Sequence, residues 1–272
     1  MDRIRNAVTR ARHERDKVTP SQEAAANAVA AAARPEPRAP SHDYDFAPAE
    51  CDFNNFGKHR IIANEQDPVL NAYRVLRTRV LQKMEANNWR TLAVVSPGSG
   101  AGKTVTAINL AIAIGSKSGS RATLIDLDFY RPSVARYLGL KDFPSVLDYF
   151  EGNKELREIA LRPELPDVLV LANERVTRRG AELLTSARAD QLIDTAVNGF
   201  SSRVVIFDMS PLLGCDDTIA FLPKVDCVLL VAASGDTRVD ELKEAKRVLG
   251  QTNILGTVLN KAPAAFMPNQ YY

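Results

Sequence analysis

The sequence predicts an α/β fold in which a mostly parallel sheet is flanked by helices on both faces. Two observations lead to this prediction. Short β-rich runs from residue 91 onward are apolar on both sides, as strands buried on both faces are. Amphipathic segments with helical spacing alternate with these runs, as the crossover helices of a parallel sheet do.

The expected elements follow one another in a simple order. A first helix is predicted over 68–84, because apolar residues recur there at helical spacing. Strands are then expected at 91–96, 122–126, 168–171, 204–208, 227–233 and 254–259, with helices near 103–115, 187–197 and 239–249. These elements lie in about 200 residues, enough for one sizeable core.

The two ends of the chain differ from this middle part. Residues 1–18 are basic and are interpreted as a solvated, partly helical tail, or alternatively as a docking segment for an acidic membrane surface or a partner. Residues 19–66 are interpreted as a low-complexity flexible linker, because the Ala- and Pro-rich stretch in them buries too little apolar surface to offset its ordering entropy. The ordered domain is expected over 67–261, and a mobile tail over 262–272.

Composition excludes several classes of protein. The 272 residues are 45% hydrophobic and 25% charged, and 35 Lys+Arg against 33 Asp+Glu leave a net charge of +2. This balance does not fit a strongly basic nucleic-acid binder, so no nucleic-acid partner is expected. The three cysteines are scattered, the start is not a signal peptide, and the apolar stretches are shorter than the roughly 20 residues that span a bilayer. A soluble, cytoplasmic protein is expected.

A glycine-rich loop carries the predicted chemistry. It runs from Ser96 to Thr104, between an expected strand and an expected helix, and its glycines allow successive backbone N–H groups to wrap around phosphates. Lys103 would reach the β- and γ-phosphates, and the Thr104 hydroxyl would bind Mg²⁺. Pro97 stands where the strict pattern has its first Gly. The motif predicts a P-loop NTPase whose nucleotide contacts come from Gly98, Ser99, Gly100, Ala101, Gly102, Lys103, Thr104 and Val105.

Polar residues follow three further expected strands. Asp126 and Asp128 end one strand, and Asp208 ends another in the Walker B arrangement that supports Mg²⁺. Because ligands of doubly wound sheets bind at the carboxyl ends of strands, these carboxylates favour metal and phosphate chemistry, although a single Asp there is more often a turn former. Asn260 ends a late strand, where its amide either pairs with an adenine edge or simply forms a turn.

In order and spacing, these motifs resemble the bacterial tyrosine kinases of capsule and exopolysaccharide export (BY-kinases, CpsD/CapB type), within the MinD/ParA-like P-loop ATPases. The resemblance covers about residues 65–272 and rests on the segments 72–78, 96–104, 124–140, 181–186, 204–217, 226–250 and 256–263. It implies an ATP- and Mg²⁺-dependent protein-tyrosine autokinase that regulates exopolysaccharide polymerisation and export.

The resemblance also implies roles for individual residues. Asp126 would be the metal-linked residue that helps to deprotonate the incoming tyrosine, and a neighbouring subunit would phosphorylate the tail at Tyr271 and Tyr272. The implied catalytic set is Lys103, Asp126, Asp128 and Asp208, and the implied metal ligands are Thr104, Asp126 and Asp208.

The chain departs from the family pattern in several places. Asn71 replaces the acidic residue that precedes Arg74 and Arg77 in the ring-assembly pattern, and Tyr130 replaces an Arg after the second Walker Asp. Gly98 stands where MinD/ParA-type positioning ATPases carry a signature Lys, which favours the kinase branch. The alternatives are a MinD/ParA-like ATPase, or a nucleotide-sensing scaffold of the same export machinery without kinase activity.

The resemblance finally implies partners and a location. A chain that starts at Met1 and has no membrane span is similar to relatives that act with a separate membrane adaptor, a polysaccharide co-polymerase or chain-length regulator. A homo-oligomer and a cognate tyrosine phosphatase are further implied partners. The expected location is cytoplasmic, peripheral at the inner face of the plasma membrane through that adaptor.

Overall fold

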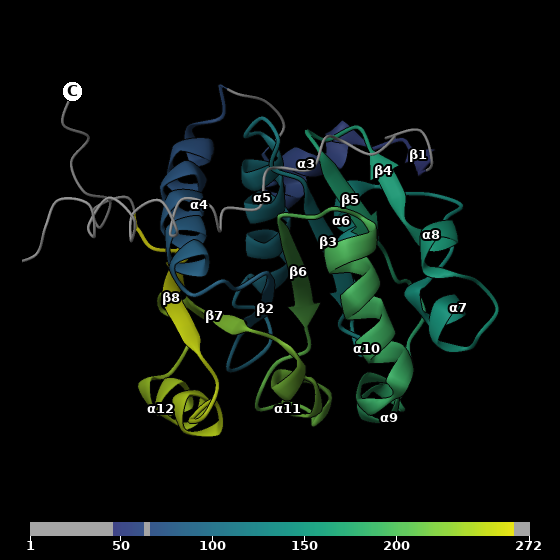
Figure 1. Cartoon of the computed structure of the whole chain (residues 1–272). Helices are drawn as coiled ribbons and strands as arrows, with labels where there is room; N and C mark the ends of the chain where they lie inside the picture. Colours follow the sequence, from purple (N-terminus) through teal and green to yellow (C-terminus); the bar gives the residue numbers. More distant parts are fainter. Residues whose placement is uncertain (1–45, 63–65, 264–272) are drawn as a thin grey trace, which may run out of the picture. The chain divides into compact units, whose positions relative to one another are not determined.

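The predicted α/β architecture is confirmed by the computed structural model, which describes residues 46–62 and 66–263 (Figure 1). The predicted basic tail (1–18), the linker as far as residue 45, and the tail tyrosines Tyr271 and Tyr272 lie outside the described residues. All described residues belong to one compact unit, residues 43–272.

An eight-stranded sheet runs through the described part of the chain, in the order β1-β4-β5-β3-β6-β2-β7-β8. All neighbouring pairs are parallel except β4 and β5, which are antiparallel. The order places β2 beside β6, and β6 beside β3, so three strands that are distant in sequence are neighbours at the centre. The strands are β1 (Ala47–Ala49), β2 (Thr91–Val95), β3 (Ala122–Leu127), β4 (Leu161–Pro163), β5 (Val168–Leu171), β6 (Val204–Met209), β7 (Cys227–Ala233) and β8 (Ile254–Asn260).

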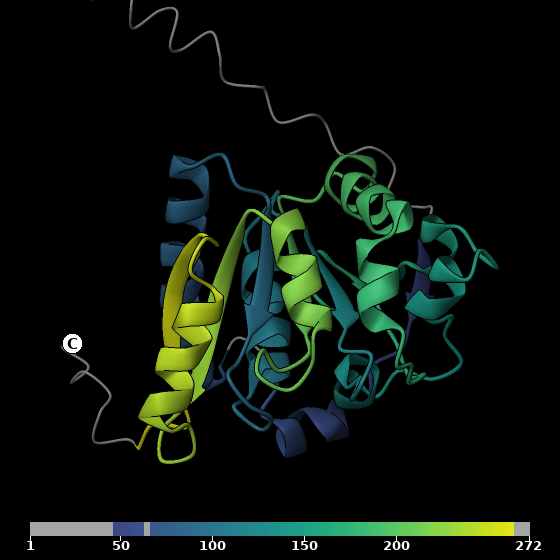
Figure 2. The same cartoon turned by 90° about the horizontal axis from the view of Figure 1, so that it is seen from below.

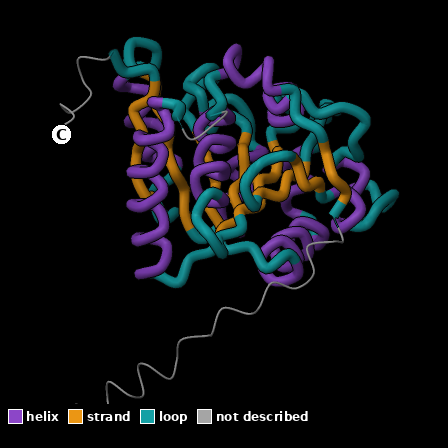
Figure 3. The backbone as a smooth tube through the Cα atoms, turned by 90° about the horizontal axis from the view of Figure 1, so that it is seen from above, coloured by secondary structure: helices purple, strands orange, loops and turns teal. Residues whose placement is uncertain are grey.

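Helices cover both faces of this sheet, as the views in Figures 2 and 3 show. One hydrophobic cluster joins the sheet to α3 (Phe53–His59), α4 (Pro68–Ala86), α5 (Lys103–Gly115) and α6 (Val134–Leu138). A second cluster joins the other face to α7 (Val146–Phe150), α8 (Leu156–Ile159), α9 (Gly180–Thr185), α10 (Ala187–Asp194), α11 (Asp217–Phe221) and α12 (Val239–Val248).

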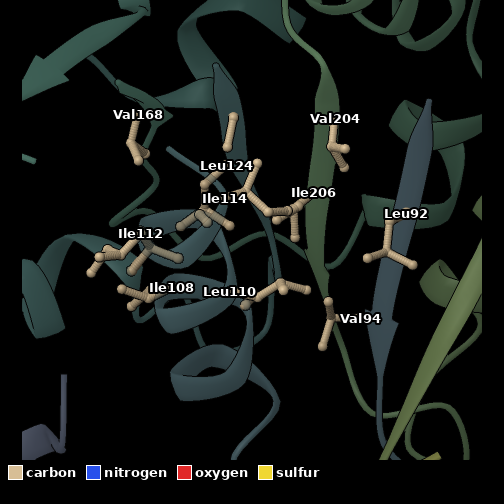
Figure 4. Close-up of a cluster of buried hydrophobic side chains, with 14 of the residues drawn as sticks. Leu92, Val94, Ile108, Leu110, Ile112, Ile114, Leu124, Val168, Val204 and Ile206 are labelled. Carbon is tan, nitrogen blue, oxygen red and sulfur yellow. The ribbon is translucent and has the colours of Figure 1, made fainter. Parts of the chain in front are cut away.

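The strands are apolar on both sides because both faces are covered. Leu92 and Val94 of β2 belong to the first cluster, whereas Ala93 and Val95 belong to the second, as the two-residue period of a strand requires. Helix α5 is the central helix of the first face, and all of its residues except Val105 are buried. Figure 4 shows its isoleucines and Leu110 among side chains of β2, β3 and β6. This packing fixes the start of α5 against the end of β2.

The linker prediction is wrong over residues 46–62. This segment contains β1, which pairs with β4, and α3, whose first turn is capped by the Asp52 carboxylate. Phe56, Ile61 and Ile62 are all buried, and the Ile62 N–H donates to Asn109 Oδ1 of α5. The linker was predicted from the composition of the longer stretch that includes this segment. A few apolar side chains are nevertheless enough to anchor a segment when each of them is buried in the core.

The sequence-based prediction also lacked several short helices and strands of three to six residues. β4 and the helices α6, α7, α8, α9 and α11 are too short for hydrophobic periodicity to reveal them. The predicted helix near 187–197 is α10 followed by a π-helical turn, Thr195–Gly199. Within the described ranges, no helix combines the length and the apolar character needed to cross a membrane.

Candidate functional site

The site lies where β2, β6 and β3 end. The glycine-rich loop joins β2 to α5, and the first residue of α5 is Lys103. Asp208 pairs in register with Val94 of β2 on one side and with Asp126 of β3 on the other. The sheet order therefore brings the loop and both carboxylate-bearing strands to one edge, as the sequence predicted from their positions at strand ends.

Two glycines let the loop adopt its conformation. Gly100 and Gly102 have φ values of +82° and +89°, in the left-handed region that L-residues avoid. A Cβ on Gly102 would lie 2.1 Å from Asn260 Nδ2, so the loop passes close to the end of β8. Gly102 is also the N-cap of α5 and has no side chain that could occupy the first-turn N–H groups. Those N–H groups are therefore available to an anion.

Lys103 is the only cation at the centre of this cluster of described side chains. Its Nζ lies 2.6 Å from Asp128 Oδ2 and 3.4 Å from Asp208 Oδ1, and the residue is 8% exposed. The Thr104 hydroxyl donates to Asp208 Oδ2 at 2.6 Å. The four side chains predicted from three separate motifs thus meet in one buried group.

The electrostatics divide the carboxylates into two kinds. Burial raises the pKa of Asp126 and of Asp208, and the pKa of each stays above its ordinary value. Burial acts in the same direction on Asp128, but the Lys103 ammonium outweighs it and holds the pKa of Asp128 below its usual range. Burial lowers the pKa of Lys103, yet Asp208 and Asp128 outweigh this effect and raise it. Lys103 therefore compensates Asp128 most directly, and three carboxylates around one ammonium leave negative charge that an additional cation would balance.

The Asp126 carboxylate accepts hydrogen bonds from backbone N–H groups. Its Oδ2 accepts the N–H groups of Ser133 and Val134 at 3.0 Å, and its Oδ1 accepts the N–H of Asp128 at 3.1 Å. The carboxylate thereby caps α6 and shapes the turn that carries Asp128. Its implied part in deprotonating a tyrosine stays a prediction, and the geometry adds an anchoring role to it.

Oxygen donors at this edge fit Mg²⁺. Thr104 Oγ1 and Asp208 Oδ2 are adjacent, and the raised pKa of Asp208 indicates that a further cation would stabilise its charge. Mg²⁺ prefers oxygen ligands and takes only a few from the protein when it binds with a nucleotide. Thr104 and Asp208 would therefore hold it, and Asp126 Oδ1, which accepts a single backbone N–H, keeps an acceptor site that could also face the cation.

Asn260, the last residue of β8, contacts the phosphate loop through its side chain. Its Nδ2 donates to the Ala101 carbonyl at 2.9 Å, and its Oδ1 accepts the N–H of Lys261. The amide thus ties β8 to the phosphate loop, a contact that neither reading of the sequence included. Its pairing with an adenine edge stays a prediction.

The sequence reasoning missed the residues that follow Asp208. The fully buried Ser210 donates from Oγ to Asp128 Oδ1 at 2.9 Å, and its carbonyl accepts the Thr218 hydroxyl at 2.7 Å. Asp217 is buried against Gly180, and its Oδ2 has no hydrogen-bond partner among the described residues. A hydroxyl residue two positions after a Walker B Asp was a signal that the sequence contained.

Two positions at which the sequence was compared with the family pattern, Arg77 in α4 and Tyr130 after β3, can be placed in the structure. Arg77 donates to the Ala113 carbonyl at the end of α5, so its guanidinium serves the fold of its own chain. Tyr130 is 40% exposed beside the site. Exposed Val176 and Leu213 come from the loops after β5 and β6, so they also belong to the carboxyl-end rim.

A separate cleft of about 870 Å³ lies at the opposite, amino-terminal end of β2 and β7. Arg90, Asp190 and Asp226 are among its lining residues, and each has partners within the protein. The candidate site is therefore identified by the phosphate loop and its carboxylates, and this cleft is not part of it.

Comparison with known proteins identifies the family of the chain. Residues 92–270, more than half of the chain, match the model of the CobQ/CobB/MinD/ParA nucleotide binding domain. The chain is 29% identical over 207 residues to the putative tyrosine-protein kinase EpsB of Ralstonia solanacearum. The aligned region covers 75% of this chain and 27% of EpsB. It is 26% identical over 207 residues to the tyrosine-protein kinase YwqD of Bacillus subtilis, covering 75% of this chain and 86% of YwqD.

Solved structures give the same result. The kinase domain of the Escherichia coli tyrosine kinase ETK superposes with a TM-score of 0.69 at 26% identity, over 78% of this chain and 83% of that domain. The chain spans only about a quarter of the length of EpsB, whereas it spans most of YwqD. EpsB and YwqD are both named tyrosine-protein kinases, and the chain itself belongs to the CobQ/CobB/MinD/ParA nucleotide-binding domain family.

Proposed function

We propose that this protein is an ATP-dependent protein-tyrosine autokinase. One observation carries the proposal: Lys103, Thr104, Asp128 and Asp208 form one buried group at the end of the phosphate loop. Phosphoryl transfer needs mainly positioning and charge neutralisation, and this group supplies both. The similarity to EpsB, YwqD and the ETK kinase domain, all named as tyrosine kinases, supports tyrosine as the acceptor.

Each residue has a definite task in this proposal. The loop N–H groups from Gly98 to Val105 bind the phosphates, and Lys103 transfers its ammonium contact from Asp128 to the β/γ-phosphates. Bound Mg²⁺, held by Thr104 and Asp208, would neutralise charge on the transferred phosphoryl group. Asp128, which contacts Lys103, would then present a carboxylate that can orient an incoming phenol.

The cellular role belongs to the same proposal. The resemblance to BY-kinases supports a part in exopolysaccharide or capsule polymerisation and export, with a membrane co-polymerase as partner. The acceptors would be Tyr271 and Tyr272, which lie outside the described residues. A homo-oligomer, a cognate tyrosine phosphatase and a peripheral location at the inner face of the membrane complete the proposed setting.

A labelling experiment tests the activity. The full chain is incubated with Mg²⁺ and [γ-³²P]ATP, and phosphotyrosine is detected by antibody and located by tryptic mass mapping. We expect label on Tyr271 or Tyr272, and its loss in a Tyr271→Phe/Tyr272→Phe variant that still turns over ATP. Lys103→Met should lower labelling by at least about 100-fold, because it removes a charge that neutralises the transferred phosphoryl group.

Lys224→Met is the matched control. Lys224 pairs with Asp190 at the other end of the sheet, so its loss should leave labelling near the wild-type value. If the wild type hydrolyses ATP and labels no tyrosine, the kinase proposal is wrong. The MinD/ParA-like ATPase or the nucleotide-sensing scaffold would then be the better interpretation.

A further inference from the structure

We propose that Ser210 is a positioning residue that holds the Asp128 carboxylate in its working orientation. This inference rests on the proposed function, because it assigns a residue to the phosphoryl-transfer site. Ser210 was not among the predicted site residues, and its side chain is fully buried next to that site.

The two oxygens of Asp128 have separate partners. Oδ2 accepts from the Lys103 ammonium at 2.6 Å. Oδ1 accepts from Ser210 Oγ at 2.9 Å and from the Arg131 N–H at 3.0 Å. Because the Ser210 hydroxyl and the Arg131 N–H hold Oδ1, the other oxygen, Oδ2, faces Lys103.

Ser210 is itself held in place. Its carbonyl accepts the Thr218 hydroxyl at 2.7 Å, and it lies between the last residue of β6, Met209, and Pro211, whose φ is fixed by its ring. Two residues further on, the Leu212 N–H donates to the Ser96 carbonyl at the start of the phosphate loop, 2.9 Å away. The backbone that carries the hydroxyl is therefore held in place by contacts with Thr218 and with the start of the phosphate loop.

The benefit appears when Lys103 moves toward a phosphate. Asp128 then loses its charged partner, and a buried carboxylate with too few donors would turn or shift. The Ser210 hydroxyl and the Arg131 N–H keep Oδ1 in place, so Oδ2 stays aimed at the position that Lys103 and the nucleotide share. Such preorganisation affects the reacting step more than the binding of nucleotide.

The test replaces single buried hydroxyls in the full-length protein. Ser210→Ala removes the donor to Asp128 but keeps the carbonyl that Thr218 binds, and Ser210→Thr restores a hydroxyl. Ser202→Ala is the matched control, because Ser202 is equally buried and its hydroxyl bonds to Thr123 Oγ1 at 2.6 Å, before β6 begins. The kcat and KM for ATP are measured by two readouts, phosphate release and protein labelling.

We expect Ser210→Ala to lower kcat about tenfold and to change the KM for ATP by less than about twofold. Ser210→Thr should recover most of the rate, and Ser202→Ala should leave kcat near the wild-type value. In an Asp128→Asn background, Ser210→Ala should cause little further loss, because Ser210 acts through Asp128. This cycle decides the question even if the threonine variant does not fold.

Three results would overturn the inference. One is a kcat loss in Ser210→Ala no larger than in Ser202→Ala, and another is a raised KM at unchanged kcat. The third is a full Ser210→Ala effect that persists in the Asp128→Asn background. If the wild type releases phosphate but labels no tyrosine, the kinase proposal fails while phosphate release still tests Ser210. A wild type that does neither refutes both.

Discussion

Positive charge is scarce at the centre of the site, where one lysine lies among three buried carboxylates that differ in their partners. Lys103 contacts Asp128 and Asp208, Thr104 also donates to Asp208, and Asp126 accepts hydrogen bonds from three backbone N–H groups. The three carboxylates were predictable, because each follows a strand in a known motif. Their different partners, which are Lys103 for Asp128, Thr104 and Lys103 for Asp208, and backbone N–H groups for Asp126, were not, since they come from other segments.

The contact between the loop and Asn260 leads to a residue-scale prediction. Gly102→Ala should lower the free energy of unfolding by about 1–2 kcal/mol, because φ of +89° is unfavourable for an L-residue. Affinity for a fluorescent ATP analogue should also fall, since the new Cβ displaces Asn260 from the Ala101 carbonyl. Urea denaturation and a fluorescence titration measure the two effects.

Two variants control for this prediction. Gly98→Ala should be tolerated, because a Cβ there meets nothing within 4 Å and its φ is ordinary. Adding Asn260→Ala to Gly102→Ala should recover only part of the loss, since the clash disappears while the backbone strain persists. Equal stability of Gly102→Ala and Gly98→Ala would contradict the assigned geometry.

At the scale of elements, long and short segments differed in how far they could be predicted. The central strands and α4, α5 and α12 were found close to their observed bounds, because each repeats its hydrophobic pattern over one or more periods. Helix α3 was missed, although Phe56 packs in the same cluster as α5. A helix of seven residues with one fully buried aromatic side chain has no period to detect.

The packing of α3 predicts a measurable contribution to stability. Phe56→Ala should lower the free energy of unfolding by about 3–5 kcal/mol, the usual loss for a fully buried Phe. Phe53→Ala is the control in the same helix, because Phe53 is 46% exposed and should cost only about 1 kcal/mol. Urea denaturation of both variants tests this. Similar small losses would restore the linker interpretation for residues 46–62.

At the scale of the whole molecule, the sheet order makes the site. Chain order runs β2, β3, β6, whereas spatial order runs β3, β6, β2, so the Walker B strand lies between the other two. The site is then open at one edge of the sheet, to which β8 also delivers its carboxyl end. A tail that follows β8 by a few residues thus starts at the edge where the phosphates would bind.

A mixing experiment tests how the tail is used. The segment 264–272 spans at most about 30 Å when extended, which allows either its own site or a neighbour's. The resemblance to BY-kinases implies transfer between chains. We therefore expect phosphate on the tyrosines of Lys103→Met when it is mixed with Tyr271→Phe/Tyr272→Phe and ATP. If the wild type labels itself in a separate reaction but Lys103→Met stays unlabelled in the mixture, transfer occurs within a chain.

The alternation of strands and helices, the phosphate loop and the carboxylates at the strand ends could all be predicted from the amino-acid sequence. These features are local, because the period of a strand, the conformational freedom of glycine and the spacing of a motif involve only neighbouring residues. Three features became visible only in the folded chain: Ser210 contacts Asp128, Asn260 binds the loop, and residues 46–62 join the core. Each of these depends on which distant segments become neighbours, and that follows from packing the whole sheet.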